Sequence, residues 1–196
     1  MKRTAKAERK TKETDIKVEL SLDGQGEVEV DTGIPFFDHM LSMIGKHGLI
    51  DLKVKAKGDL EVDGHHTVED VGICLGQALK DALGDKRGIR RYGSSMMPMD
   101  ESLALIAIDI SGRPYLVYDV DLPVEIIGTY DTSLTVEFLQ AFTTSAGITL
   151  HAKILSGRNA HHIVEAIFKG LAIALQAAVE INPRITEVIP STKGVI

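Results

Sequence analysis

The residues best suited to chemistry are a pair of adjacent histidines followed closely by a glutamate, and this group occurs twice. HHTVE at residues 65–69 recurs as HHIVE at residues 161–165. Side chains four positions apart share one face of a helix, so His65 and Glu69 can point to one place while His66 points elsewhere. The second copy repeats the arrangement with His161, His162 and Glu165.

Neutral imidazole and carboxylate ligands suit zinc, manganese, iron or nickel, whereas the lack of thiolates argues against a closed structural zinc site. A single histidine pair is weak evidence, because surface and capping histidines are common. Two pairs with glutamate at the same offset, each opening a predicted helix, indicate metal ligation. The sequence therefore predicts two metal centres with the ligands His65, His66, Glu69, His161, His162 and Glu165.

One further ligand at each metal is expected from an earlier helix in each half. DHML at residues 38–41 aligns with VEFL at residues 136–139, so Glu137 stands where His39 stands. This symmetry makes His39 and Glu137 the candidates. His151 competes with Glu137, or it orients the site from outside the ligand shell.

The elements that must hold these residues repeat as well. Alternating polar and apolar residues precede each histidine pair and predict a strand, and a helical apolar period follows each pair. Gly84 suits the end of the first of these helices, and Pro183 stops the second. The earlier helix of the first half runs from Pro35 to Gly48. Other strands are expected at residues 16–22, 103–110 and 115–120.

Each half therefore contains strands, a helix, strands and a helix, which predicts an α+β fold of two similar α/β halves. Each half would be a mixed sheet with two helices on one face, and the two helix layers would pack together. We divide the chain into residues 1–90 and 91–196, which form one functional unit, with residues 85–100 as the connection. The methionines of this connection, Met96, Met97 and Met99, are expected to fill gaps in the packing.

The composition is that of a globular protein, with 196 residues, 44% hydrophobic and 26% charged. A net charge of −6 argues against a general nucleic-acid binder. We expect no membrane span, because no apolar run approaches about 20 residues. The single cysteine, Cys74, indicates a reducing compartment, so we expect a cytoplasmic protein. Residues 2–12 are interpreted as a solvated basic tail without a secretory signal.

Seven segments, in order, resemble the imidazoleglycerol-phosphate dehydratase family and span nearly the whole chain. They are RKTKETDI (9–16), TGIPFFDHML (32–41), HGLIDL (47–52), HHTVED (65–70), SGRPY (111–115), NAHHIVEAIFK (159–169) and PSTKG (190–194). The resemblance implies two similar α/β halves of the ribosomal protein S5 domain 2-like kind. It also implies two Mn²⁺ ions per active site and a homo-oligomer of 24 subunits, with active sites between neighbouring chains.

The resemblance further implies the elimination of water from D-erythro-imidazoleglycerol phosphate, giving imidazoleacetol phosphate in histidine biosynthesis. A carboxylate beside the substrate is a plausible general base, and Glu13 or Glu165 could serve. The family pattern has Glu13 at the substrate and Glu165 in the metal shell. It implies further substrate contacts, mainly to the phosphate, from His47, Arg91, Arg113, Lys169, Ser191 and Lys193.

Glu137 departs from the family pattern, because histidine is expected there in at least some relatives. Glu137, His151 or water therefore completes that coordination shell. Two rival functions stay open on the sequence. One is a dinuclear metallohydrolase of a small phosphoester. The other is a structural oligomer held together by metal, which would need the ligands but no phosphate-binding residues.

Overall fold

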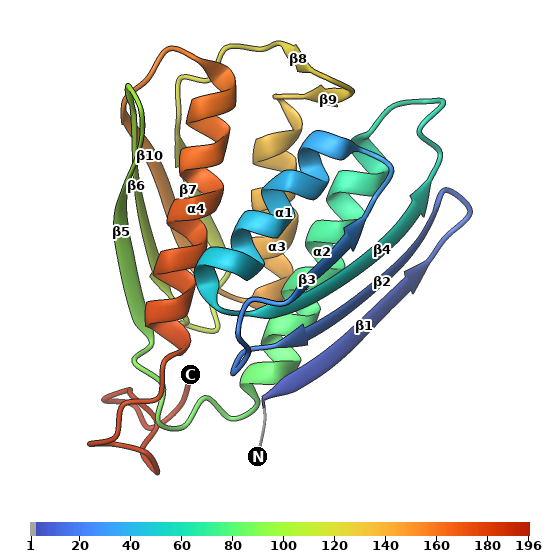
Figure 1. The fold of residues 1–196 in the computed structure, drawn as a ribbon. Coiled ribbons are helices and arrows are strands. Elements are labelled where there is room, and N and C mark those ends of the chain that lie inside the picture. Colours follow the sequence, from blue (N-terminus) through green and yellow to red (C-terminus); the bar gives the residue numbers. More distant parts are fainter. Residues whose placement is uncertain (1–2) are drawn as a thin grey trace.

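The structure is a computed structural model that describes residues 3–196, in which two sheets enclose a layer of helices (Figure 1). The first sheet has four strands in the order β1-β2-β4-β3, and β3 runs parallel to β4. Its elements and their helices are β1 (Thr4–Lys10), β2 (Thr14–Ser21), β3 (Val28–Asp31), α1 (Pro35–Gly48), β4 (Asp51–Gly58) and α2 (His65–Leu83).

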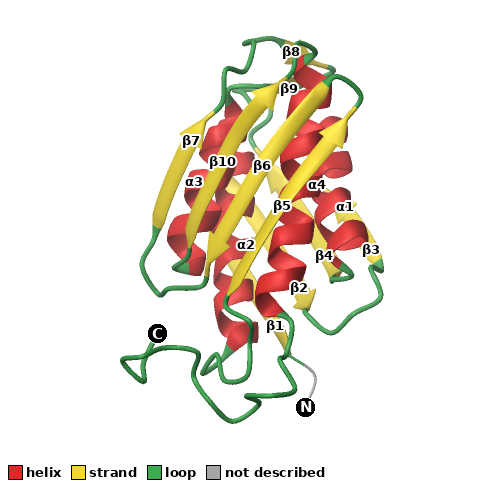
Figure 2. Ribbon diagram, turned by 90° about the vertical axis from the view of Figure 1, so that its left-hand side faces the viewer, coloured by secondary structure: helices red, strands yellow, loops and turns green. Residues whose placement is uncertain are grey.

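The second half repeats this topology. Its sheet has the order β5-β6-β10-β7, with β7 parallel to β10, and Figure 2 shows the outer face of this sheet. Its elements are β5 (Tyr92–Met99), β6 (Ser102–Asp109), β7 (Tyr115–Asp119), β8 (Ile126–Ile127), β9 (Tyr130–Asp131), α3 (Leu134–Ala146), β10 (Thr149–Ser156) and α4 (Ala160–Val179). The hairpin β8-β9 is an addition to the second half. The predicted α+β fold with duplicated halves is confirmed.

The helix layer forms one core because the helices of one half pack against those of the other. α1 contacts α4 and α2 contacts α3, while α2 also covers β1 and β2, and α4 covers β5 and β6. Alternate strand residues such as Ile16, Val18 and Leu20 are buried under the helices. This shared core joins the two halves, and the division between residues 90 and 91 stays a prediction.

Residues 4–10 form β1, so the expectation of a solvated basic tail is wrong for this segment. The strand lies at the edge of the sheet and needs few apolar residues, which is why the sequence pattern concealed it. Its charges pair with neighbours: Lys6 with Glu19 at 2.9 Å and Lys10 with Asp15 at 2.8 Å. Lys2, also assigned to that tail, lies outside the described residues.

The connection between the halves is shorter than residues 85–100, because β5 begins at Tyr92. The methionines therefore belong to a strand. Met96 points to the outer face of the sheet and is 62% exposed, so it does not fill a gap in this chain's core. Met97 and Met99 lie on the inner side and are half-buried.

The helix α4 is long and apolar enough to cross a membrane by length and composition alone, although no apolar run of that length was expected from the sequence. Its most apolar window is 72% buried inside the protein. Between the second sheet and α1 it has the surroundings of a core helix, which accounts for its apolar composition.

Candidate active site

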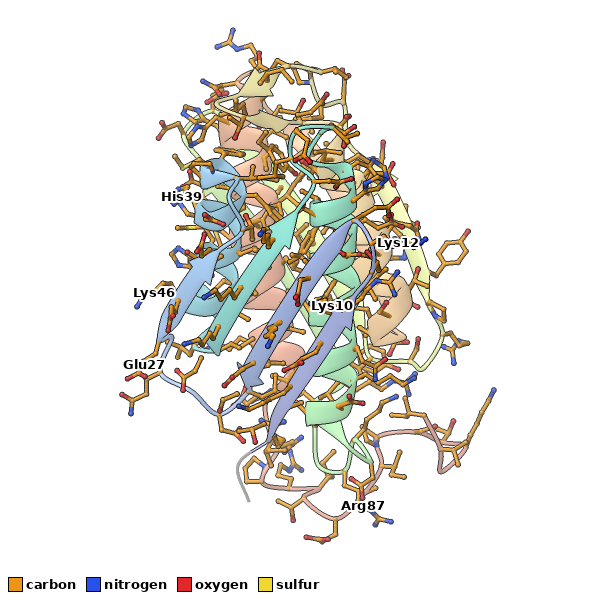
Figure 3. The ribbon with its side chains drawn as sticks, turned by 90° about the vertical axis from the view of Figure 1, so that its right-hand side faces the viewer. Lys10, Lys12, Glu27, His39, Lys46 and Arg87 are labelled. Atoms are coloured by element: carbon orange, nitrogen blue, oxygen red, sulfur yellow. The ribbon has the colours of Figure 1, made fainter. Side chains whose placement is uncertain are left out.

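The predicted metal ligands lie in the early turns of the helices, which gather at one end of the molecule. In Figure 1, α2, α3 and α4 begin at the upper end, and α1 begins beside them. Figure 3 shows His39 toward the upper end of α1 and Lys46 toward its lower end. The duplicated topology thus brings predicted ligands from both halves to the same end.

His39, His161 and Glu165 form a group whose ligand atoms all lie within 4.8 Å of one another. Nε2 of His161 is 3.1 Å from Oε2 of Glu165, and Nε2 of His39 is 3.6 Å from the same oxygen. His161 and Glu165 share a face of α4, and His39 comes from α1, which packs against α4. Two imidazoles and a carboxylate at this spacing fit a divalent metal ion.

Glu165 is held as an anion in this group. It is only 6% exposed, and its second oxygen, Oε1, lies 2.5 Å from Nζ of Lys169. Burial raises the pKa of Glu165, but the ion pair with Lys169 and the hydrogen bond with His161 outweigh it, so the pKa lies below its ordinary value. Lys169, expected to bind substrate, is therefore paired with Glu165 here.

The first histidine pair diverges as the helical spacing predicts. His65 and Glu69 point together, with Nε2 of His65 3.7 Å from Oε2 of Glu69. His66 turns away, and its Nδ1 lies 3.0 Å from an oxygen of Asp59, which follows β4. The hydrogen bond with Asp59 raises the pKa of His66, and the negative charge of Glu13 adds to this effect.

The second pair diverges in the same way, with a different carboxylate as partner. Nδ1 of His162 lies 2.7 Å from Oε2 of Glu101, in the turn between β5 and β6. Glu101 also accepts the backbone N–H of Asn159 at 2.9 Å, so it binds the start of α4 to that turn. The hydrogen bond with His162 holds the pKa of Glu101 well below its ordinary value, and the carboxylate in turn raises the pKa of His162.

Asp59 and Glu101 were not found from the sequence, although a histidine ligand usually bonds such a carboxylate through its other nitrogen. Asp59 follows a strand and carries no motif. Glu101 occupies the same place in the hairpin β5-β6 that Glu13 occupies in β1-β2. Aligning the two hairpins, in place of the two histidine motifs, would have identified Glu101.

Glu137 and His151, the two candidates for the last ligand position, lie on different sides of the second sheet. Glu137 is half-buried in the first turn of α3 and forms no hydrogen bond or ion pair with residues 3–196. His151 is exposed on β10, between the buried Leu150 and Ala152, and therefore faces away from the helix layer. Within one chain, His151 does not reach the ligands on the helices.

The predicted phosphate-binding residues gather where the C-terminal segment meets the second sheet. Arg91 donates from Nε to Asp109 at 2.7 Å and from Nη1 to the carbonyl of Pro190 at 2.9 Å. The side chain of Arg91 is 12% exposed, whereas that of Arg113 is 69% exposed. Nη2 of Arg113 lies 3.8 Å from Oδ2 of Asp109. Arg91 thus holds the segment that carries Ser191 and Lys193, and Arg113 is open to a ligand.

The predicted phosphate-binding residues, including Arg91 and Arg113, form the phosphate end of the chain, and the predicted metal ligands, including His161, form the metal end. These two ends lie far apart within one chain. The backbone N–H of Arg91 donates to the carbonyl of Ala178, in the last turn of α4, whereas His161 is in its first turn. α4 has 20 residues, which corresponds to a length of about 30 Å. A small phosphorylated substrate therefore cannot contact both groups of residues in one chain.

The remaining substrate-binding candidates occupy two other places. Glu13 is exposed in the turn between β1 and β2, near enough to His66 to affect its pKa. Figure 3 shows the neighbouring Lys12 at the upper end of the β1-β2 hairpin. His47 is exposed in the last turn of α1, two turns beyond His39.

The duplicated α+β fold with a His-His-Glu cluster between its halves is that of a candidate metal-binding enzyme. The comparisons with known proteins give the family. A family model described as imidazoleglycerol-phosphate dehydratase matches residues 32–175. Relatives with that name include one from Moorella thermoacetica, 56% identical over 100% of both chains. Another, from Dinoroseobacter shibae, is 59% identical over 98% of both chains.

Two solved structures of imidazoleglycerol-phosphate dehydratases share the fold. The Staphylococcus aureus structure has a TM-score of 0.83 and 38% identity, covering 91% of this chain and 99% of its own. The Pyrococcus furiosus structure, in complex with (S)-C348, has a TM-score of 0.83 and 40% identity. The match covers 96% of this chain and 99% of the Pyrococcus chain. The chain belongs to the imidazoleglycerol-phosphate dehydratase family, hydro-lyases of histidine biosynthesis, which confirms the family and function expected from the sequence.

Proposed function

We propose that the protein eliminates water from D-erythro-imidazoleglycerol phosphate to give imidazoleacetol phosphate, at a site with two Mn²⁺ ions. The observation that carries this proposal is the cluster of His39, His161 and Glu165 in a member of this family. Its imidazole and carboxylate donors suit Mn²⁺ among other divalent ions. His65, Glu69 and the outward-turned His66 and His162 are the proposed remaining ligands, together with Glu137.

The bound ions would supply Lewis-acid polarisation of the substrate's imidazole ring. The chain's own residues would move the protons. Glu165 is buried, paired with Lys169 and low in pKa, which suits a ligand more than a base. Glu13 is exposed in the β1-β2 turn, where its charge raises the pKa of His66, and it is the better candidate to carry a proton.

The phosphate would be bound by Arg113, Ser191 and Lys193, with Arg91 holding the C-terminal segment in place. The length of α4 keeps these residues away from the metal ligands of the same chain. We therefore propose that each active site combines the metal end of one chain with the phosphate end of another. This requires a homo-oligomer, for which we propose 24 subunits, and we propose that it works in the cytoplasm.

The direct test is to incubate the Mn²⁺-loaded protein with imidazoleglycerol phosphate and to measure the ketone product and free phosphate. Dehydration yields the ketone with no phosphate released. Release of phosphate without ketone would instead identify a metallohydrolase, and the absence of any turnover would favour a structural role for the metal.

The same assay tests Glu13. We expect Glu13→Gln to lower kcat by roughly 100-fold or more, in the range of general acid–base catalysis, with metal content unchanged. Glu8→Gln is the matched control, because Glu8 is exposed on the adjacent β1 strand. Turnover of the Glu13 variant within a few fold of wild type would remove Glu13 from the mechanism.

A further inference from the structure

Asp70 is a buried carboxylate beside the first histidine motif that the proposed mechanism does not use. It is 7% exposed, in the second turn of α2. One of its oxygens accepts from Nε of Arg9 at 2.7 Å, and the other accepts from the hydroxyl of Thr14 at 2.5 Å. Both partners belong to the first β-hairpin and not to the helix. Asp70 therefore connects α2 to β1 and β2.

The two partners flank the turn that carries Glu13. Arg9 lies near the end of β1, and Thr14 begins β2. Inside the turn, Oγ1 of Thr11 accepts the backbone N–H groups of Glu13 at 3.1 Å and of Thr14 at 2.9 Å. The turn is thus tied within itself and, on both sides, to Asp70.

The start of α2 lies close to this hairpin. Gly58, which pairs with Thr14, faces Thr67 of α2 so closely that a Cβ at Gly58 would clash with the Thr67 hydroxyl. Arg9 also lies near Glu69, whose charge raises the pKa of Arg9 after the larger effects of Asp70. The Glu13 turn therefore sits against the turns of α2 that carry the proposed ligands.

The second half builds the same corner without these side chains. Ala166 stands where Asp70 stands, Met97 where Arg9 stands and Ser102 where Thr14 stands. There, Glu101 of the β5-β6 turn joins that turn to the start of α4 by accepting the backbone N–H of Asn159 at 2.9 Å. The Arg-Asp-Thr contact occurs in the half whose turn carries Glu13.

We propose that Asp70, through Arg9 and Thr14, is a positioning residue that fixes the β1-β2 turn on α2 and so holds Glu13 at the substrate. This inference rests on the proposed role of Glu13. Without the contact, the turn keeps its strands but loses its fixed distance to α2. A small displacement of a catalytic group can lower the reaction rate by a large factor.

The test uses the assembled, Mn²⁺-loaded enzyme. We expect Asp70→Asn, Thr14→Val and Arg9→Met each to lower kcat by roughly 10- to 100-fold, as removal of supporting residues does, with metal content and assembly unchanged. Arg9→Lys keeps the charge and should recover part of the loss. Lys10→Met is the matched control, because Lys10 pairs with Asp15 on the outer face of the same hairpin. Its kcat should stay within twofold of wild type.

A positioning role is separated from a structural one by combining Asp70→Asn with Glu13→Gln. If Asp70 acts through Glu13, Asp70→Asn should lower kcat only slightly further in the Glu13→Gln background. An equal loss in both backgrounds, or wild-type kcat in all three single variants, overturns the inference while the proposed function stands. A wild-type enzyme that forms no ketone overturns the proposed function and the inference with it.

Discussion

At the scale of single residues, the two oxygens of Glu165 have different partners. Oε1 is paired with Lys169, while Oε2 faces His39 and His161. One oxygen is therefore neutralised by the protein and the other is directed at the two imidazoles. A metal ion placed among the three side chains would take Oε2 without breaking the Lys169 ion pair.

We expect Glu165→Gln to weaken Mn²⁺ binding at this cluster by at least roughly 100-fold, more than loss of an outer partner costs. The amide keeps the shape but removes the charge. Metal content after dialysis and calorimetric titration would measure this change. Glu180→Gln, on an exposed residue beyond the end of α4, is the control. Unchanged metal content would show that Glu165 is not a ligand.

At the scale of elements, glycines set how closely the helices approach. Gly72 and Gly76 of α2 face α3, and a Cβ at Gly76 would lie 2.5 Å from the carbonyl oxygen of Phe142. This close approach keeps the first turns of α2 and α3 in fixed relative positions. The proposed ligands in those turns, including Glu69 and Glu137, depend on it.

Gly76→Ala should therefore destabilise the protein by roughly 1–3 kcal/mol, the usual cost of overpacking, although alanine favours helices. Thermal or urea unfolding measures the change in the free energy of unfolding. Lys80→Ala, on the exposed side of the same helix, should change it by less than about 0.5 kcal/mol. A stabilised Gly76 variant would show that helix propensity outweighs the close approach.

Arg3 joins the two halves at the other end of the helix layer. Its Nη1 donates to the carbonyl of Val179 at the end of α4, at 2.6 Å, and its Nη2 lies 2.6 Å from Asp23. The hydrogen bond with Arg3 lowers the pKa of Asp23 despite its partial burial. A carboxyl with a lowered folded pKa contributes stability above its unfolded pKa of about 4, and this contribution disappears as pH falls through the folded value.

Asp23→Asn should accordingly lower the melting temperature at pH 6, and the difference from wild type should shrink as pH falls below about 4. Melting curves of both proteins across this range would test the sign. Asp121→Asn serves as control, because this exposed residue forms no ion pair with residues 3–196. A difference that is constant with pH would contradict the ion pair.

At the scale of the whole molecule, the distance between the metal end and the phosphate end prevents one chain from binding a small substrate at both. Each chain carries a complete set of predicted residues, but the length of α4 separates them. An active site built from two chains uses both ends of every chain. Catalysis would then depend on assembly, even though each chain folds around a single helix layer.

Mixing two inactive variants tests this arrangement. His161→Ala removes a proposed metal ligand, and Arg113→Ala removes a proposed phosphate contact. We expect each variant alone to have little activity. Dissociated, mixed and reassembled with Mn²⁺, they should regain activity, because some sites combine an intact metal end with an intact phosphate end. Each variant carried alone through the same treatment is the control. No recovery on mixing would contradict shared sites.

The amino-acid sequence by itself determined the duplication, the helix starts at Pro35 and at His65, and the pairing of His161 with Glu165. These features follow from spacing along one chain segment, because a helix brings residues four positions apart onto one face. The α+β class followed from the same periodicity. The edge strand β1 was hidden, since its charged residues pair across strands and bury little apolar surface.

Only the tertiary structure decided which distant groups meet. His39 joins His161 because α1 packs on α4, Glu101 reaches His162 from a hairpin, and Asp70 reaches Arg9. Such contacts join segments far apart in the chain, and their distances are set by how the layers pack and not by sequence spacing. The same packing puts Arg91 at the far end of α4, which is why the predicted metal ligands and the predicted phosphate-binding residues lie at opposite ends of one chain.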